Sequence, residues 1–321
     1  MTNQQTLRQG KNECEIIGLL KEKNLEIKPL LDKVTGAPYN AIIGDIVVKV
    51  NEHDEHKVKI FSKELTKAGA ESKLFKAYKT IMETYTSIAD LSQMSEADRE
   101  GRYPTRLRVR GELRVNDYYS NNQMNSFPEI SGKFISSDVK PETPDCATFG
   151  AEIYVSKKKH ELDKDGIETG RLEIQGLLVG YKGRVSPIQF KVTEEHGVAD
   201  YLDSNFHVGE TIEVWGFLVN SAITVKKVKQ GFGVQKEEIT TTYRNEILIN
   251  GGEEFALDEA KAFDSTLIQK ALAEREILLA SKEEEGKTRV NKPKTQTAGF
   301  GGQRKATPTP PEKMKTEDIP F

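Results

Sequence analysis

The sequence lacks any apolar run of the roughly 18 residues that a membrane-spanning helix needs, and its first residues, MTNQQTLRQGKNE, are polar. Neither a membrane span nor a secretory signal peptide is therefore expected, and we predict a cytoplasmic protein. Cysteine is also scarce. Cys14 and Cys146 stand far apart and have no CxxC partner, which argues against a zinc site or a disulfide framework.

Motifs of the common enzyme classes are missing too. The chain has no phosphate-binding P-loop motif, no HExxH zinc motif and no GxSxG nucleophile motif. DKDG, at residues 163–166, resembles the start of a calcium loop but lacks the later glutamate, so a hairpin turn explains it better. We therefore predict a protein that is not an enzyme and that has no cofactor and no metal.

An overall positive charge is absent as well. The chain has 47 Lys and Arg against 50 Asp and Glu, a formal net charge of −3. From Lys282 to the end there are nine basic and six acidic residues, so the preceding part is more acidic than the whole. A chain that is basic all over is excluded, and any contact with nucleic acid must come from local stripes of positive charge.

What the sequence does contain is an internal repeat. EIIGLL (15–20) resembles EIQGLL (173–178), and RLRVRGELRV (106–115) resembles TIEVWGFLVN (211–220), with apolar residues alternating around a central glycine. A glycine inside a strand usually marks a bulge or a tight bend in a curled sheet. Two units with the same pair of glycine-centred strands indicate a duplicated domain.

Alternation of apolar and polar residues predicts five strands in each unit. Each unit also has a helical pattern between its third and fourth strands, near 70–90 and near 195–204. This order is typical of an OB barrel, whose sheet face and loops bind oligonucleotides. The expected strands are 13–28, 39–50, 56–62, 106–115 and 128–137 in the first unit, and 149–158, 168–181, 185–193, 210–219 and 222–229 in the second.

The predicted fold class is mainly β with some α: two tandem OB-like five-stranded barrels, a C-terminal helix and a disordered tail. The stretch EEITTTYRNEILIN, which follows the last expected strand, has the pattern of a further hairpin. The tail is rich in Lys, Thr, Pro and Gly and almost free of aliphatic residues. The expected domains are 1–140 and 141–255 for the barrels, 256–285 for an amphipathic helix, and 286–321 for the tail with its partner-binding tip.

The strand RLRVRGELR is the first candidate site, because its apolar residues face one way and its arginines the other. Alternate residues of a strand lie about 7 Å apart, comparable with the spacing of phosphates on an extended single strand. Arginine contacts phosphates in a bidentate manner and stacks on bases. The alternative is a solvated strand face that discourages edge pairing. The arginines are Arg106, Arg108, Arg110 and Arg114.

Aromatic residues and lysine clusters supply further candidates. Trp215 lies on the outer face of the strand equivalent to the arginine strand, where it either stacks on bases or packs the two units together. Residues 116–127, NDYYSNNQMNSF, are expected to form a long polar loop beside the ligand groove, where exposed rings indicate a contact. Its rings belong to Tyr118, Tyr119 and Phe127. The lysine candidates, with a solvated surface as the alternative, are Lys157, Lys158, Lys226 and Lys227.

The last four residues are Asp318, Ile319, Pro320 and Phe321. They resemble, letter for letter, the C-terminal tip of bacterial single-stranded-DNA-binding proteins. A given four-letter ending arises by chance in about one of 10⁵ chains. The resemblance implies that the tip recruits replication, recombination and repair proteins, with Phe321 in an apolar pocket and Pro320 limiting the entropy lost on docking. A second barrel and a less acidic tip depart from that family and look like a bacteriophage-encoded member of it.

The sequence therefore predicts a protein that binds and protects single-stranded DNA, independent of base sequence, in DNA replication and recombination. Its expected location is the cytoplasm, here of a phage-infected bacterium. Two alternatives stay open. One is a scaffold or adaptor whose barrels bind proteins, and the other is an enzyme that processes nucleic acid.

Overall fold

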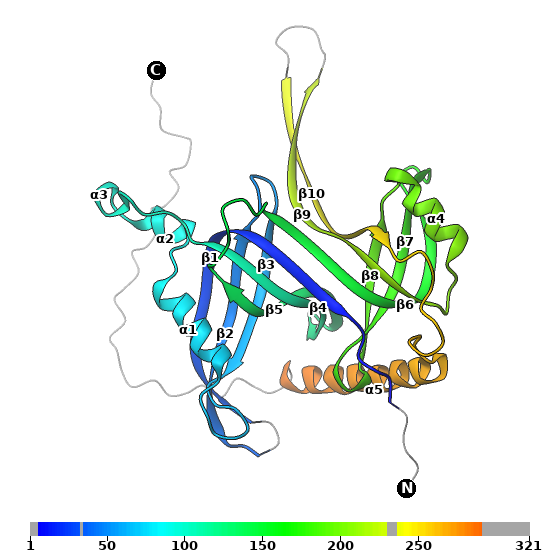
Figure 1. The fold of residues 1–321 in the computed structure, drawn as a ribbon, viewed down its shortest axis with the longest axis horizontal. Helices are drawn as coiled ribbons and strands as arrows, with labels where there is room; N and C mark the ends of the chain where they lie inside the picture. Colours follow the sequence, from blue (N-terminus) through cyan, green and yellow to red (C-terminus); the bar gives the residue numbers. More distant parts are fainter. Residues whose placement is uncertain (1–5, 33–34, 230–235, 291–321) are drawn as a thin grey trace, which may run out of the picture.

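The structure is a computed structural model, and it describes residues 6–32, 35–229 and 236–290. Side chains are described over the same ranges except at 223–229, 236–242 and 289–290. Figure 1 shows two groups of strands side by side, with helix α5 along one side of both. The prediction of a mainly β protein with some helices and a C-terminal helix is confirmed.

The first unit, Asn12–Ser136, holds five strands and three helices in the described ranges. They are β1 (Asn12–Leu31), β2 (Pro38–Lys49), β3 (Glu55–Lys63), α1 (Lys73–Thr84), α2 (Ile88–Gln93), α3 (Glu96–Arg99), β4 (Arg106–Ser120) and β5 (Gln123–Ser136). The second unit, Cys146–Gly252, is followed by α5. Its elements are β6 (Cys146–Leu162), β7 (Glu168–Val179), η1 (Tyr181–Gly183), β8 (Val185–Val192), η2 (Glu195–Gly197), α4 (Val198–Asn205), β9 (Thr211–Lys229), β10 (Lys236–Gly252) and finally α5 (Ser265–Val290).

Strand pairing follows the same circular order in both units. In the first unit the order is β1–β2–β3–β5–β4 and back to β1, and in the second it is β6–β7–β8–β10–β9 and back to β6. All these pairs are antiparallel except β3–β5 and β8–β10, which are parallel. β1 also pairs with β6, so one hydrogen-bonded sheet runs through both units.

The core of each unit lies inside its ring of strands, where alternate side chains point inward and are buried. A helix between the third and fourth strands packs against each ring, as the sequence predicted. Ser72 caps α1, whose Phe75, Tyr78 and Ile81 are buried. The Tyr78 hydroxyl lies 3.1 Å from two carbonyl oxygens of β5, which satisfies its polar end in the core.

Gly111 and Gly216 occupy equivalent places in β4 and β9, the fourth strands of the two units. A Cβ on Gly111 would lie 2.2 Å from the Ser131 carbonyl oxygen, and one on Gly216 would lie 1.9 Å from that of Leu248. Only glycine allows the fifth strand to approach this closely, and the pairing register shifts beside both sites. The predicted equivalence of 106–115 and 211–220 is therefore confirmed.

The other predicted correspondence is wrong. EIIGLL lies in β1, the first strand of the first unit, whereas EIQGLL lies in β7, the second strand of the second unit. Both segments have the alternating pattern of a half-buried strand, which does not by itself identify a strand's place in the ring.

The predicted break between strands 210–219 and 222–229 is also wrong, because β9 continues through it to Lys229. The fifth strand of the second unit is β10, at Lys236–Gly252. The middle of β9 is held by the turn before β3: Ala222 N donates to the His53 carbonyl oxygen over 3.1 Å. Beyond this point β9 and β10 extend away from the body as a two-stranded arm (Figure 1).

Residues 116–127 form a tight hairpin and not the expected long loop. β4 and β5 stay paired out to Ser120 and Gln123. The two turn residues, Asn121 and Asn122, have φ angles of 51° and 60°. Asparagine tolerates this left-handed conformation, which a two-residue turn of type I′ requires at both positions.

Helix α5 begins at Ser265, later than the expected start near 256, and ends at Val290, later than 285. Asp264 caps its first turn, because Leu267 N donates to the Asp264 carboxylate over 2.9 Å. Asp258, expected in the first helical turn, instead closes an isolated turn with Lys261. The tail from 291 onward, with its expected disorder, lies outside the described residues.

α5 connects the two units. Near its start, Ile268 is fully buried against the second unit with Leu177 and Val185. Farther along, the Arg275 guanidinium makes two hydrogen bonds of 2.6 and 2.8 Å to the Asp117 carboxylate of the β4–β5 hairpin. Both side chains are largely buried, at 15% and 9% exposed. The pair therefore fixes the hairpin of the first unit against a helix anchored on the second.

No helix in the described ranges combines the length and the apolar character needed to cross a membrane.

Replacing Arg275 with Met should destabilise the protein by about 3 kcal/mol, because the Asp117 carboxylate would stay buried without its partner. The urea dependence of the circular dichroism signal measures this loss. Lys79→Met, which breaks the exposed Lys79–Glu83 pair, is the control and should cost under about 0.5 kcal/mol. Equal effects of the two substitutions would mean that α5 does not fix the hairpin.

Candidate nucleic-acid interface

A cavity of about 320 Å³ lies between the two units. One wall comes from β3 and the β4–β5 hairpin of the first unit, and the other from β9 and β10 of the second. We refer to it as the inter-unit groove. Charged, amide and aromatic side chains contribute to its lining, among them Lys57, Lys59, Asn116, Tyr118, Phe127, Glu129, Asn220, Asn245 and Glu246.

Two hydrogen bonds between the units, each between a backbone group of one residue and a side chain of another, fix the width of the groove. Asn220 N donates to the Asp54 carboxylate over 2.8 Å, and Asn220 Nδ2 donates to the Glu55 carbonyl oxygen over 2.7 Å. Burial alone would raise the pKa of Asp54. The contact with His56 and the Asn220 N–H outweigh burial, and they hold the pKa below its ordinary value. The Asp54 carboxylate is therefore charged at neutral pH, which strengthens its hydrogen bond to β9.

Of the three aromatic residues expected in the loop 116–127, two lie together in the groove. The rings of Tyr118 and Phe127 are stacked, with centroids 6.0 Å apart and an interplanar angle of 25°. They are 42% and 53% exposed, so each ring still has open surface. Tyr119 points to the other side of the hairpin, where its ring packs so close to α5 that a Cβ on Gly286 would lie 2.3 Å from it. Adjacent residues of a strand face opposite ways, which separates Tyr119 from the other two.

The arginines of β4 point outward as predicted, while Leu107, Val109 and Leu113 are buried. Each arginine has a carboxylate partner. Arg106 is 2.6 Å from Asp145 and also binds the carbonyl oxygens of Lys140 and Thr143. The other pairs are Arg108–Glu15 at 3.4 Å, Arg110–Glu15 at 3.0 Å, and Arg114 with Glu112.

Trp215 lies on the outer face of β9 and is 43% exposed. Its cross-strand neighbours are Gly150 of β6 and Gly251 of β10, and its indole covers Gly251, where a Cβ would lie 2.5 Å from Nε1. The units are joined through β1 and β6, whereas the Trp215 indole packs on Gly251 of its own unit. Phe217, two residues on, is exposed on the same face.

Among the lysine candidates whose side chains are described, Lys157 and Lys158 have different surroundings. Lys158 is 2.8 Å from the Asp203 carboxylate and donates to the carbonyl oxygens of Asp203 and Phe206, so it holds the end of α4. Lys157 is exposed beside a shallow hollow of the second unit. Lys226 and Lys227 lie in β9, but their side chains are outside the described set. The tip residues Asp318, Ile319, Pro320 and Phe321 are outside the described residues altogether.

The structure brings into the site a basic face that the sequence analysis did not single out. The outer face of β3 carries Lys57, Lys59, Phe61 and Lys63, which we call the β3 stripe. His56, Val58, Ile60 and Ser62 alternate with them and are buried. The alternating run HKVKIFSK is the signal that could have identified it, because period two places three lysines and one aromatic ring on a single face.

Carboxylates in the groove limit its positive charge. Burial raises the pKa of Glu129 above its ordinary value, and nearby Lys59 and Arg114 offset this only in part. Burial would also raise the pKa of Glu246, but hydrogen bonds from Arg171 and Arg244 outweigh it and hold that pKa low. The two glutamates should therefore respond oppositely to pH. In the part of the chain that the structure describes, no cluster of three or more metal-ligating side chains occurs.

Glu129→Gln should stabilise the protein at pH 7, because the folded state disfavours the charged form of Glu129. Its advantage should develop as the pH rises through the interval between the unfolded and folded pKa values and stay constant above it. Glu246→Gln should destabilise the protein at pH 7, with a loss that shrinks as the pH falls from the unfolded pKa through the lower folded pKa. Urea midpoints from pH 3 to pH 8 measure both, and shifts of the same sign at pH 7 would contradict this assignment.

Comparison with known proteins gives one family and several distant structures. The YorF family model matches residues 11–285. No curated protein sequence matches the chain. A deletion mutant of the single-stranded DNA binding protein from Thermus aquaticus is similar with 12% identity and a TM-score of 0.42, covering 78% of this chain and 97% of that one. The wild-type form gives 11% identity and a TM-score of 0.41, covering 77% and 93%. Because the family model covers most of its length, the chain belongs to the YorF family.

Proposed function

We propose that the protein binds single-stranded DNA without sequence preference, through two tandem OB-like barrels over 1–140 and 141–255. The barrel assignment is supported by the shared circular strand order and by the helix between the third and fourth strands of each unit. The observation that carries the function is the groove between the units, where the stacked Tyr118 and Phe127 rings lie beside lysines of β3.

The chemistry of the groove fits an unpaired strand. Open aromatic faces attract bases of any sequence, each stacked base being worth about 1–3 kcal/mol. Asn116, Asn220 and Asn245 offer amide donors and acceptors to base edges or sugars. Lysine ammonium groups in the same lining attract phosphates. The groove has no catalytic group in this proposal, and the protein acts by binding alone.

The basic candidates differ in how readily they can leave their partners within the protein. Arg110 and Arg114 are 64% and 55% exposed, and exposed ion pairs are worth only about 0–1 kcal/mol, so either can exchange its carboxylate for a phosphate. Arg106 has three partners in the segment 140–145 and Lys158 holds the end of α4, so both serve the structure first. Trp215 supplies a further exposed ring for stacking on the outer face of the second unit.

The C-terminal tip is proposed to recruit proteins of DNA replication, recombination and repair. Its sequence, Asp318 to Phe321, combines an acidic side chain with an apolar ring and follows a long Lys- and Pro-rich stretch. Such an end suits an apolar pocket with a basic rim. The groove and the tip are far apart in sequence, so the two activities should be separable.

Replacing Tyr118 and Phe127 together with Ala should weaken binding to labelled oligo-dT at least about tenfold, because two stacking faces are removed. Fluorescence polarisation at fixed salt gives the affinity. Tyr103→Ala/Tyr181→Ala, which removes two exposed rings outside the groove, is the matched control and should change the affinity less than about twofold. If the wild-type chain captures no oligo-dT, DNA binding is wrong and the protein-scaffold alternative gains.

Deleting Ile319 to Phe321 should leave the affinity for oligo-dT unchanged and abolish the capture of replication proteins from a bacterial lysate. The physical reason is the loss of the Phe321 ring and of the chain end that follows Asp318. Polarisation and pull-down on the same preparations measure the two effects. Equal capture by intact and truncated chains would remove the tip from partner binding.

A further inference from the structure

The parallel strand pairs give a residue-by-residue equivalence between the two units. In the first unit Lys59 of β3 pairs with Ser131 of β5, and in the second Lys191 of β8 pairs with Leu248 of β10. Ser131 also lies opposite the residue that follows Gly111, just as Leu248 lies opposite the residue that follows Gly216. Lys59 and Lys191 are therefore equivalent outward residues of the third strands.

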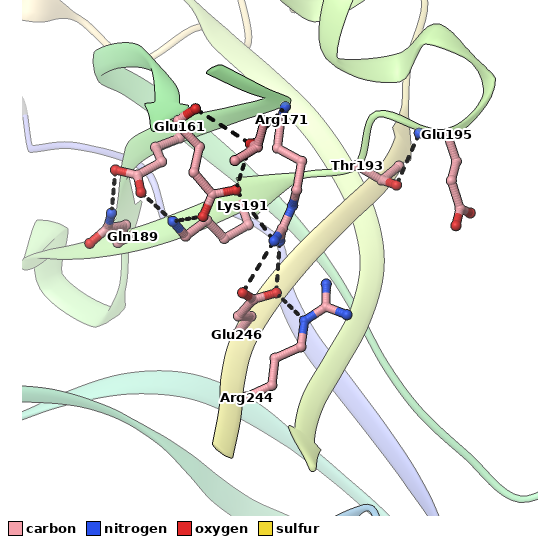
Figure 2. Close-up of polar contacts among 10 residues, drawn as sticks. Glu161, Arg171, Gln189, Lys191, Thr193, Glu195, Arg244 and Glu246 are labelled. Atoms are coloured by element: carbon pink, nitrogen blue, oxygen red, sulfur yellow. Dashed lines mark hydrogen bonds and ion pairs between the residues drawn. The ribbon is translucent and has the colours of Figure 1, made fainter. Parts of the chain in front are cut away.

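In the second unit, carboxylates of the same unit pair with the cations on the outer face of β7 and β8. Lys191 is 2.6 Å from the Glu161 carboxylate and also pairs with Glu173. Arg171 is 3.3 Å from Glu161 and 2.7 Å from Glu246. Figure 2 shows Arg171 between these two carboxylates. These side chains are only 11–19% exposed. A phosphate would have to displace largely buried, hydrogen-bonded partners to reach either cation, which is costly.

The pKa values of Lys191 and Glu173 are shifted in the directions that such ion pairs produce. Burial alone would lower the pKa of Lys191, but hydrogen bonds to Glu161 and Glu173 outweigh it and keep the pKa above its ordinary value. Burial would raise the pKa of Glu173, and its lysine partners outweigh burial and keep that pKa low. Lys191 and Glu173 are therefore both charged at neutral pH.

The first unit has a single ion pair at the corresponding place. The residue of β2 opposite Lys59 is Asp45, and the residue of β7 opposite Lys191 is Glu173. Lys59 has Asp45 as its carboxylate partner and is 43% exposed, whereas Lys191 has two carboxylate partners and is 19% exposed. The face of the first unit is therefore more open.

The other lysines of the β3 stripe are easier to reach. Lys57 lies opposite the apolar Val47 and is exposed in the groove lining. Lys63 is 44% exposed, is 3.3 Å from Asp32 and lies 4.1 Å from the centre of the Tyr39 ring. An exposed ion pair of this kind contributes about 0–1 kcal/mol and is screened by salt, so a phosphate can replace the carboxylate with little loss of stability. Lys59 is held more firmly, because the Asp45 side chain is only 14% exposed.

We infer that the two units have different tasks: the β3 stripe of the first unit follows the phosphate backbone of the single strand, while the equivalent face of the second unit is closed by its own ion pairs. The second unit then contributes the far wall of the groove through Asn220 and Asn245. This inference rests on the proposed function and assigns the backbone contacts within it.

The test uses the full chain and a labelled oligo-dT, with affinities measured at several salt concentrations. Lys57→Ala/Lys63→Ala should weaken binding and make the slope of log K against log salt shallower by about 1.4, or about 0.7 for each phosphate that is no longer neutralised. The control Lys164→Ala/Lys182→Ala removes two exposed lysines of the second unit and changes the net charge equally. It should keep the wild-type slope. Thermal melts of both variants should match the wild type.

Two outcomes would overturn the inference. If the control loses as much affinity and slope as the β3 variant, the backbone is not assigned to the first unit, while DNA binding itself stands. If the β3 variant keeps the full slope, the stripe does not follow phosphates. Absence of binding by the wild-type chain is distinguishable from both, because it removes the proposed function itself.

Discussion

The pairing of β1 with β6 is the interaction on which the rest of the structure depends. Cys14–Ile17 of β1 pairs on one edge with β4 and on the other with β6, so the first strand of the chain belongs to the first ring and also connects it to the second. The Asp54 turn on β9 and the Arg275–Asp117 pair then hold the two sides at a fixed separation. The groove is a consequence of these three contacts.

A duplicated fold allows its two copies to diverge. The strand registers stay equivalent, as the pairs Lys59–Ser131 and Lys191–Leu248 illustrate. The outer faces differ in their ion pairs: Lys59 pairs with Asp45 alone and stays 43% exposed, whereas Lys191 is held by Glu161 and Glu173. The lysine with fewer carboxylate partners is more accessible to a phosphate. Function can therefore be gained or lost on a strand face without a change in the barrel beneath it.

Much of the fold could be predicted from the sequence, because period-two alternation fixes strands and their buried faces. The arginine strand shows this, with its buried and outward residues as predicted. Local patterns could not locate the end of β9, since the contact that keeps it continuous comes from His53 and Asp54, more than a hundred residues away. The Asn121–Asn122 turn was also missed, although asparagine is one of the few residues that tolerates the positive φ angles of a type I′ turn.

The site was less predictable than the fold, because ion pairs between distant strands decide which charges are available. Nothing in the run of lysines at 157–159 indicates that Lys158 holds the end of α4. Similarly, three of the four β4 arginines find their partners on β1 or in the segment before β6. The β3 stripe was readable in principle, since its alternation is complete within nine residues.

Photo-cross-linking of the full chain to oligo-dT that carries a photoreactive thymine, followed by mass spectrometry of the adducts, identifies the residues that the strand contacts. If single-stranded DNA lies in the inter-unit groove and along the β3 stripe, adducts should form on Tyr118, Phe127 and the peptide that holds the β3 stripe. Adducts confined to the outer face of β7 and β8 in the second unit would contradict this placement of the strand.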